Sequence, residues 1–225
     1  MPTIQLIRHG QASFGGPDYD VLSEGGRMQS LLLARELANR ETRVELIVSG
    51  SLRRQYETAE PSATLLEREV LVDTRWNEYD MDEILTHHSS TRARTHQEAG
   101  AEPVSSAEFQ DVLEDGLAAW IEAGPSSPAR ESWPAFAGRI TTALGELAAE
   151  LSPGSTGLVF TSGGVVAALC SAALKYPDQS LLAFNRVSVN TGITKLVTGR
   201  RGLTLVSFNE HGHLERTNPP LISYR

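Results

Sequence analysis

Short apolar segments alternate with longer amphipathic segments along the chain, and this alternation constrains the fold more than any other feature. Short aliphatic runs predict strands, while apolar residues three or four positions apart predict helices. Regular alternation of the two is typical of an α/β domain. Strands are predicted at residues 3–8, 46–49, 70–73, 158–161, 187–197 and 203–209, and helices at 23–40, 52–66, 108–123, 133–151 and from Gly164 to Leu174.

Two of the predicted helices have a recognisable apolar face. Ser23 is a suitable N-cap for the first, in which we expect Met28, Leu31, Leu32 and Leu37 to point inward. The helix over 133–151 has large apolar residues at helical spacing, which indicates a buried stripe. These residues are Trp133, Phe136, Ile140, Leu144, Leu147 and Leu151.

The segment 77–132 is more polar than the rest and contains His87, His88, His96 and a Pro/Ser-rich stretch at 124–128. We interpret it as an insertion that forms a cap over the core. The predicted organisation is therefore one domain over residues 1–225, a three-layer α/β sandwich with a mostly parallel sheet, helices on both faces and this cap. Arg92 and Arg94 could contact a second anionic group of a ligand, or belong to a solvated face.

Composition excludes several functional classes. The 225 residues include 20 Lys+Arg and 28 Asp+Glu, a net charge of −8. Such a chain lacks the clustered basic charge that nucleic acids and anionic membranes attract, so we expect neither as a partner. Cys170 is the only cysteine, which excludes an internal disulfide and a cysteine-based zinc cluster. No signal peptide or membrane span is apparent, and we expect a cytoplasmic protein.

Polar residues that could carry chemistry follow the first strand. In open α/β sheets, ligands bind beyond the carboxyl ends of the strands. His9 at such an end could attack a phosphoryl group as neutral imidazole, and Arg8 could donate to the phosphate oxygens. Gly10 gives the chain conformational freedom there. Taken alone, the tripeptide is explained more simply as an exposed loop histidine beside an incidental arginine.

Three further elements follow later strands. The segment 49–54 opens a helix with small residues before Arg53 and Arg54, which suits an anion, although the two side chains diverge by roughly 100° and only one can face a pocket. Glu78 could protonate a leaving group if its pKa were raised, or could be an ordinary surface acid. The glycines of 161–164 allow backbone N–H groups to approach an anion, or form a plain strand-to-helix turn.

The order of these elements resembles the histidine phosphatase superfamily, also called phosphoglycerate mutase-like. The resemblance rests on LIRHGQAS at 6–13, LSEGGRMQ at 22–29, IVSGSLRRQYETAE at 47–60, the Asn77-Glu78 element, VFTSGGVVAAL at 159–169 and FNEHGHL at 208–214. It spans nearly the whole chain.

The resemblance implies a phosphatase that needs no metal or cofactor and acts on a small phosphorylated substrate through a phosphohistidine. His9 matches the nucleophile, Arg8 and Arg54 match the arginines that hold the phosphoryl oxygens, and Glu78 matches the acid that protonates the leaving alcohol. Ser162 and Gly163 lie where the family binds phosphate. Water would then release phosphate from His9.

The chain departs from the family pattern at Ser162, where the family has its second histidine. A serine can still donate one hydrogen bond but cannot become cationic, which puts mutase-type phosphoryl transfer in doubt. His211 or His213 could enter the pocket instead, or be structural. Two other functions remain open. One is a phosphate-binding protein with little catalysis, and the other is a serine hydrolase built on Ser162, although Phe160 stands where that motif requires glycine.

Overall fold

The computed structural model describes residues 1–13, 20–40, 42–88, 106–199 and 202–224. Internal contacts divide the chain into two compact units, one made of residues 1–78 with 140–225 and the other of residues 79–139. The second unit is close in extent to the segment 77–132 that the sequence sets apart. That the whole chain is a single domain with a cap stays a prediction.

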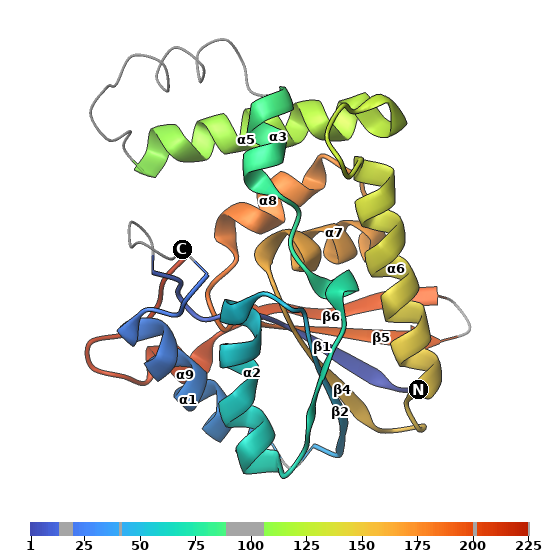
Figure 1. The fold of residues 1–225 in the computed structure, drawn as a ribbon. Coiled ribbons are helices and arrows are strands. Elements are labelled where there is room, and N and C mark those ends of the chain that lie inside the picture. Colours follow the sequence, from blue (N-terminus) through green and yellow to red (C-terminus); the bar gives the residue numbers. More distant parts are fainter. Residues whose placement is uncertain (14–19, 41, 89–105, 200–201, 225) are drawn as a thin grey trace. The chain divides into compact units, whose positions relative to one another are not determined.

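A six-stranded sheet forms the centre of the first unit, in the order β3-β2-β4-β1-β5-β6 (Figure 1). β1, β2, β3 and β4 run parallel, whereas β5 is antiparallel to β1 and forms a hairpin with β6. This confirms the mostly parallel sheet. The bounds are β1 Thr3–Arg8, β2 Val44–Ser49, β3 Val70–Val72, β4 Thr156–Thr161, β5 Ile193–Gly199 and β6 Gly202–Glu210.

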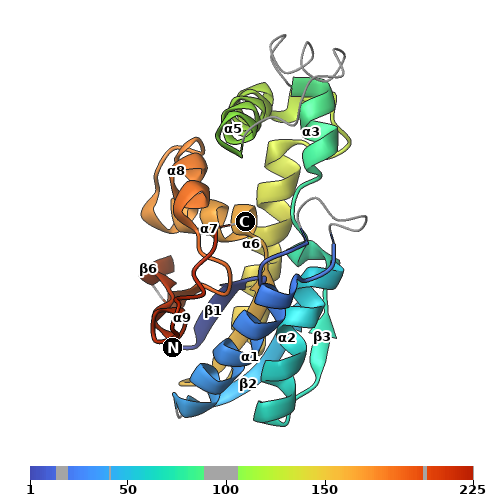
Figure 2. The ribbon, with the colours of Figure 1, turned by 90° about the vertical axis from the view of Figure 1, so that its left-hand side faces the viewer.

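Helices lie on both faces of this sheet (Figure 2). On one face, side chains of α1 and α2 form a core with alternate residues of the strands, among them Ile7, Leu158 and Phe160. Gly157 faces the opposite side, because successive strand residues alternate, and there it lies against Leu147 of α6 (Trp133–Glu150) and Leu151 just after it. The three-layer prediction is confirmed. The helices are α1 Glu24–Asn39, α2 Arg53–Leu66, η1 Thr74–Trp76, α7 Gly163–Leu174, α8 Ser180–Val187 and α9 Gly212–Glu215.

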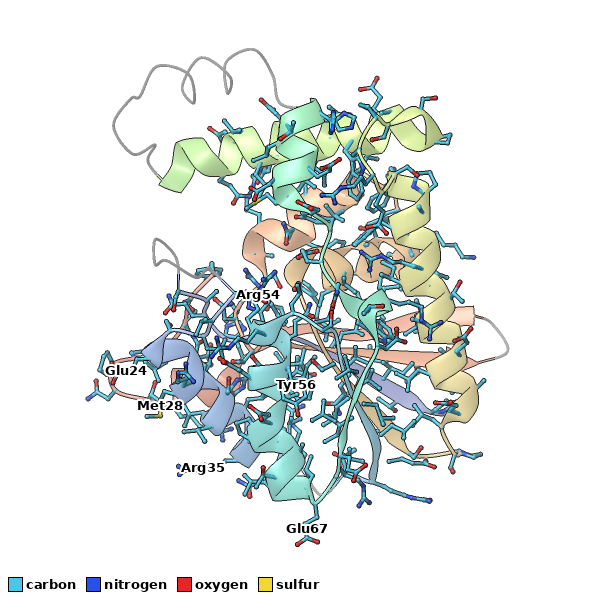
Figure 3. All side chains as sticks on the ribbon, viewed as in Figure 1. Glu24, Met28, Arg35, Arg54, Tyr56 and Glu67 are labelled. Carbon is cyan, nitrogen blue, oxygen red and sulfur yellow. The ribbon has the colours of Figure 1, made fainter. Side chains whose placement is uncertain are left out.

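The inward face of α1 differs from the prediction, although its N-cap is confirmed by the bond from Gly26 N to Ser23 Oγ (3.0 Å). Met28 and Leu31 are 48% and 47% exposed, and Figure 3 shows Met28 pointing outward from the helix. The buried stripe is Gly26, Gln29, Ser30, Leu33, Ala34 and Leu37. The polar residues Gln29 and Ser30 belong to this buried stripe because their side chains form hydrogen bonds inside the protein. The Gln29 amide, for example, donates to Leu221 O and Ser223 Oγ, both at 2.8 Å.

The segment 187–192 is also not the strand that its β-branched residues predict. α8 ends at Val187, and β5 begins only at Ile193. Between them, Asn190 N donates to Ser223 O, and Thr191, with φ of 59°, donates its N–H to Arg8 O. These residues bind the end of β1 and the C-terminal segment, so they cannot extend the β5 ladder.

The second unit is helical, with α3 Met81–His88, α5 Ser106–Ala123, η2 Gly124–Ser126 and the start of α6 Trp133–Glu150. Its core is aromatic: Trp120 contacts Tyr79, Trp133 and Phe136 at centroid distances of 5.5–5.7 Å. The stripe predicted along α6 is buried throughout. His96, Arg92 and Arg94 lie outside the described residues, as do positions 200 and 201 between β5 and β6. No helix in the described parts of the chain is long and apolar enough to cross a membrane.

Candidate active site

The backbone of His9 is fixed by the strands on both sides of β1. Its N–H donates to Thr161 O of β4 (2.9 Å), and its carbonyl accepts from the side-chain amide of Asn190, before β5 (3.0 Å). The side chain is only 4% exposed. His9 is therefore held rigidly where β1 ends, beside the end of β4.

The imidazole of His9 is held in one tautomer. Nδ1 lies 2.8 Å from Gly10 O, which can only accept, so Nδ1 carries the hydrogen and Nε2 the lone pair. Nε2 accepts from Arg54 Nε at 3.2 Å. Burial, and then the positive charges of Arg54 and Arg8, hold the pKa of His9 well below its usual range. His9 is therefore neutral near pH 7, with a nucleophilic nitrogen next to a guanidinium.

Gly10 is required by close packing. Its N–H donates to Thr58 Oγ1 of α2 (2.9 Å), and a Cβ at this position would lie 2.7 Å from Gly26 O at the start of α1. A larger residue would therefore push the first turn of α1 away from the His9 loop. Thr58 was not among the residues expected from the sequence.

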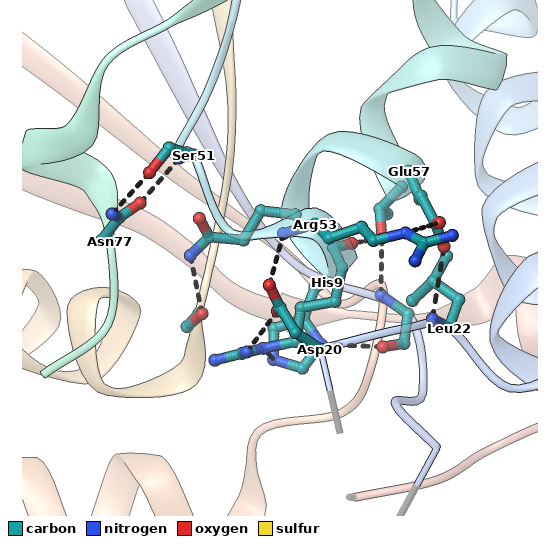
Figure 4. Close-up of polar contacts among 12 residues, drawn as sticks. His9, Asp20, Leu22, Ser51, Arg53, Glu57 and Asn77 are labelled. Carbon is teal, nitrogen blue, oxygen red and sulfur yellow. Dashed lines mark hydrogen bonds and ion pairs between the residues drawn. The ribbon is translucent and has the colours of Figure 1, made fainter. Parts of the chain in front are cut away.

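Arg54 and Arg53 diverge as their adjacent positions on α2 predict. Arg54 is 9% exposed and contacts His9, while the Arg53 side chain points to solvent and pairs with Glu57 at 2.7 Å. Asp20, which the sequence did not single out, joins the two arginines (Figure 4): Arg54 Nη1 donates to Oδ1 at 2.6 Å and Arg53 N to Oδ2 at 2.8 Å. A carboxylate thus already occupies part of the donor set of Arg54.

Arg8 approaches the start of α7. Its Nη1 donates to the carbonyls of Ser188 and Tyr224, the latter at 2.8 Å. A Cβ on Gly163 would lie 3.5 Å from Arg8 Nε and 2.6 Å from Asn185 Oδ1, so the arginine passes directly over this glycine. The structure therefore brings Arg8 and Gly163 together.

Glu78 lies at the N-terminus of α7, where its Oε2 accepts from Gly164 N (3.0 Å). It follows η1, whose Trp76 is fully buried and whose carbonyl accepts from Thr161 Oγ1 of β4 (2.6 Å). Because this contact ties η1 to the end of β4, the carboxyl group is fixed near the ends of the central strands.

Ser162 is fully buried at the N-cap position of α7, yet its side chain makes no capping bond. Its Oγ instead accepts from Gln55 Nε2 of α2 at 2.8 Å. Gln55 was not among the residues expected from the sequence. A signal was present, because Gln55, Thr58, Ala59 and Ser62 share one helical face that continues the buried side of Arg54.

The two C-terminal histidines contact other groups. His211 Nδ1 lies 2.5 Å from Asn209 O, and its Nε2 lies 3.6 Å from Glu215. His213 is buried, with Nε2 3.0 Å from Thr191 Oγ1, and burial lowers its pKa to about 4. Within the described parts of the chain, neither histidine forms a hydrogen bond or ion pair with His9 or Arg54.

The positive and acidic groups around His9 resemble no metal centre. Within the described ranges, no three His, Cys, Asp or Glu side chains cluster closely enough to hold a metal ion. The groups that do converge are an imidazole, two guanidiniums, a hydroxyl and the N-terminus of α7, a set that suits a phosphoryl group.

Comparison with known proteins agrees with this geometry. The sequence matches the family model of the histidine phosphatase superfamily (branch 1) over residues 4–211. The chain belongs to this superfamily. A search of the curated proteins finds no match to this histidine phosphatase.

Solved structures similar to this histidine phosphatase include other phosphatases. "Mycobacterial hydrolase 1" is 27% identical, with a TM-score of 0.68 over 93% of this chain and 98% of the other. A mycobacterial glucosyl-3-phosphoglycerate phosphatase in complex with VO3 is 26% identical, with a TM-score of 0.66 over 92% and 98%. A phosphoserine phosphatase mutant from Entamoeba histolytica, in complex with phosphoserine, shares the fold at 19% identity, with a TM-score of 0.68 over 95% and 100%. The family and the phosphatase neighbour at 26% identity show that the protein is a phosphatase.

Proposed function

We propose that this histidine phosphatase hydrolyses the phosphate monoester of a small molecule through a phosphohistidine on His9, without a metal ion. The observation that carries the proposal is the state of the His9 ring. Its Nδ1 hydrogen is directed to Gly10 O, and its Nε2 lone pair faces the guanidinium of Arg54.

In the first step, His9 Nε2 attacks phosphorus, an N–P bond forms and the P–O ester bond breaks. The low pKa of His9 keeps Nε2 unprotonated, so no base has to remove a proton before the attack. The imidazole becomes positively charged as the bond forms, and the nearby Gly10 carbonyl stabilises that charge through Nδ1–H.

The transferred group carries negative charge, which the arginines balance. Arg54 is adjacent to the attacking nitrogen, and Arg8 lies next to Gly163 at the start of α7. Donors placed before the reaction stabilise developing charge at little reorganisation cost. Such a local cluster also explains how a chain of net charge −8 binds an anionic substrate.

Glu78 is proposed to transfer the protons. In its protonated form it gives a proton to the leaving alkoxide, and as carboxylate it then accepts a proton from the water that attacks phosphohistidine. The N–P bond breaks, phosphate leaves and His9 is neutral again. The hydrogen bond that Gly164 N donates to Glu78 holds the Glu78 carboxyl group at the start of α7 for both steps.

The test is hydrolysis of p-nitrophenyl phosphate in the presence of EDTA, together with isolation of the phosphoenzyme. Phosphohistidine is stable in alkali and labile in acid, so a protein-bound phosphate with this stability, absent in His9→Ala, is the expected result. Turnover should fall by about 10⁴-fold or more in His9→Ala, as for loss of a nucleophile.

His87→Ala is a matched control, because His87 is exposed and contacts Glu83 at 3.3 Å. It should retain the phosphoenzyme and the turnover of the wild type. Hydrolysis by His9→Ala at the wild-type rate would overturn the mechanism. Labelling of Ser162 by a fluorophosphonate would favour a serine hydrolase, and phosphate binding without turnover of any monoester would favour a binding protein.

A further inference from the structure

Gln55 is a fully buried polar residue next to Arg54, and the mechanism above gives it no role. Its side-chain amide contacts the carbonyl of Trp76 at 3.3 Å and the hydroxyl of Ser162 at 2.8 Å, both through Nε2. A backbone carbonyl can only accept a hydrogen bond, so the contact with Trp76 requires the NH₂ group on that side. The orientation of the amide is therefore fixed by Trp76.

This orientation decides what the Ser162 hydroxyl does. Because Nε2 can only donate, Ser162 Oγ is the acceptor of the bond, and its own hydrogen must point elsewhere. The hydroxyl does not cap α7, and it donates no hydrogen bond to any of the described residues. The O–H is thus held as a donor with no acceptor inside the described protein.

The backbone places that donor beside the nucleophile. Arg8 and Thr161 are register partners in the parallel strands β1 and β4, and His9 N donates to Thr161 O, so His9 and Ser162 leave the sheet side by side. α2 reaches both: Arg54 donates to His9 Nε2, and Gln55 donates to Ser162 Oγ.

We propose that Gln55 is a positioning residue, whose amide directs the Ser162 O–H toward the phosphoryl group transferred to His9. This inference rests on the proposed function and deepens it, since it assigns the means by which an uncharged side chain next to His9 becomes a fixed donor. The chain makes room for the amide at Gly50, where a Cβ would lie 2.0 Å from Gln55 Oε1.

The first test is a double-mutant cycle on kcat and KM for p-nitrophenyl phosphate with Ser162→Ala and Gln55→Leu. Ser162→Ala should lower kcat by about 10²-fold, as loss of one transition-state donor does. Gln55→Leu should lower kcat about 10-fold with little change in KM, since the hydroxyl remains but is no longer directed. The double variant should be no slower than Ser162→Ala, because Gln55 acts only through Ser162.

A second, nearly isosteric variant guards against misfolding and supplies a pH readout. In Gln55→Glu, the carboxylate can only accept, so the Ser162 hydroxyl turns toward it and away from the substrate. When the carboxyl is protonated it can donate again. The activity of Gln55→Glu relative to wild type should therefore rise as pH falls, and most of this pH dependence should vanish in the Ser162→Ala background.

Gln29→Leu is the matched control, because the buried Gln29 amide also donates to a carbonyl and a serine hydroxyl. It should lower thermal stability as Gln55→Leu does, yet its effect on kcat should multiply with that of Ser162→Ala. If the losses of kcat in Gln55→Leu and Ser162→Ala also multiply in the double variant, the inference about Gln55 is wrong, while the phosphohistidine mechanism stands. If His9→Ala retains turnover, the proposed function itself fails, whatever the cycle shows.

Discussion

The ends of β1 and β4 are neighbours in the sheet, but the buried residue that follows each strand has a different partner. At the end of β1, His9 is buried beside two guanidiniums that lower its pKa. At the end of β4, Ser162 is buried beside the neutral amide of Gln55. Two consecutive residues of α2 make the difference, since Arg54 contacts one end and Gln55 the other. The side chain that α2 contributes, as much as the residue that follows the strand, therefore determines the chemistry at each strand end.

Among the experiments that compare the two ends, the largest expected effect comes from removing the charge at the His9 end. Arg54→Gln should lower kcat/KM by about 10³-fold, because a charged donor to the phosphoryl group is lost. It should also raise the pKa of His9, since the Arg54 charge is one of its lowering causes, and shift the acid limb of the pH–rate profile upward.

Arg53→Gln is the control for that experiment. Its side chain is exposed and pairs with Glu57, so we expect less than a threefold change in kcat/KM, as is usual for exposed ion pairs. Equal losses of kcat/KM in Arg53→Gln and Arg54→Gln would show that the contact between Arg54 and His9 has no special role in catalysis.

The next prediction concerns the pH dependence of stability, which should depend on His9 at the end of β1 but not on Ser162 at the end of β4. A histidine whose pKa is lower in the folded than in the unfolded protein stabilises the fold above pH 6.5, and this stabilisation is lost as pH falls toward the folded pKa. His9 and His213 are both of this kind, and His213, with a folded pKa of about 4, accounts for about 3 kcal/mol across that window.

Urea unfolding between pH 7.5 and 4.5 should show these contributions. The free energy of unfolding should decline with falling pH in the wild type and in Ser162→Ala alike, and less steeply in His9→Gln or His213→Asn. If His9→Gln has the wild-type slope, then burial at the end of β1 does not suppress protonation.

A third experiment places a histidine after β4, as His9 follows β1. Ser162→His should lower both thermal stability and kcat, by about tenfold or more, because the space beyond the Ser162 hydroxyl is filled by the Gln55 amide at 2.8 Å and overpacking is costly. Adding Gln55→Ala should restore stability and part of the turnover. A higher kcat in Ser162→His alone would show that the two side chains do not compete for space.

The smallest effect concerns Asp20, whose carboxylate already occupies Arg54 Nη1. Asp20→Asn keeps the shape but removes a negative charge that competes with the substrate. Inhibition by inorganic phosphate should therefore strengthen about fivefold at low salt and less at high salt.

Glu57→Gln serves as the comparison for Asp20, because it removes a similar carboxylate that pairs with Arg53 instead of Arg54. It should leave the inhibition constant nearly unchanged. Weaker inhibition in Asp20→Asn would mean that Asp20 orients Arg54 more than it competes for it.

Much of the fold could be predicted because its signals are local. The strand at 3–8, the helix over 133–151 and the glycine turn after β4 follow from spacing within a few residues, and the structure has them within one or two positions. The errors arose where packing overrides spacing. Met28 and Leu31 look like core residues, but Gln29 and Ser30 take the inner face because their polar atoms find partners there.

The candidate site divides in the same way. The sequence by itself determined which residues stand at the strand ends, His9, Ser162 and the start of α2 among them, because strand and helix periods are properties of neighbouring residues. Only the tertiary structure decided that Gln55 directs its amide to Ser162 and that Asp20 binds Arg54. Those contacts join segments far apart in the chain, and they form only where the burial of α2 against the sheet brings polar side chains close enough to satisfy one another.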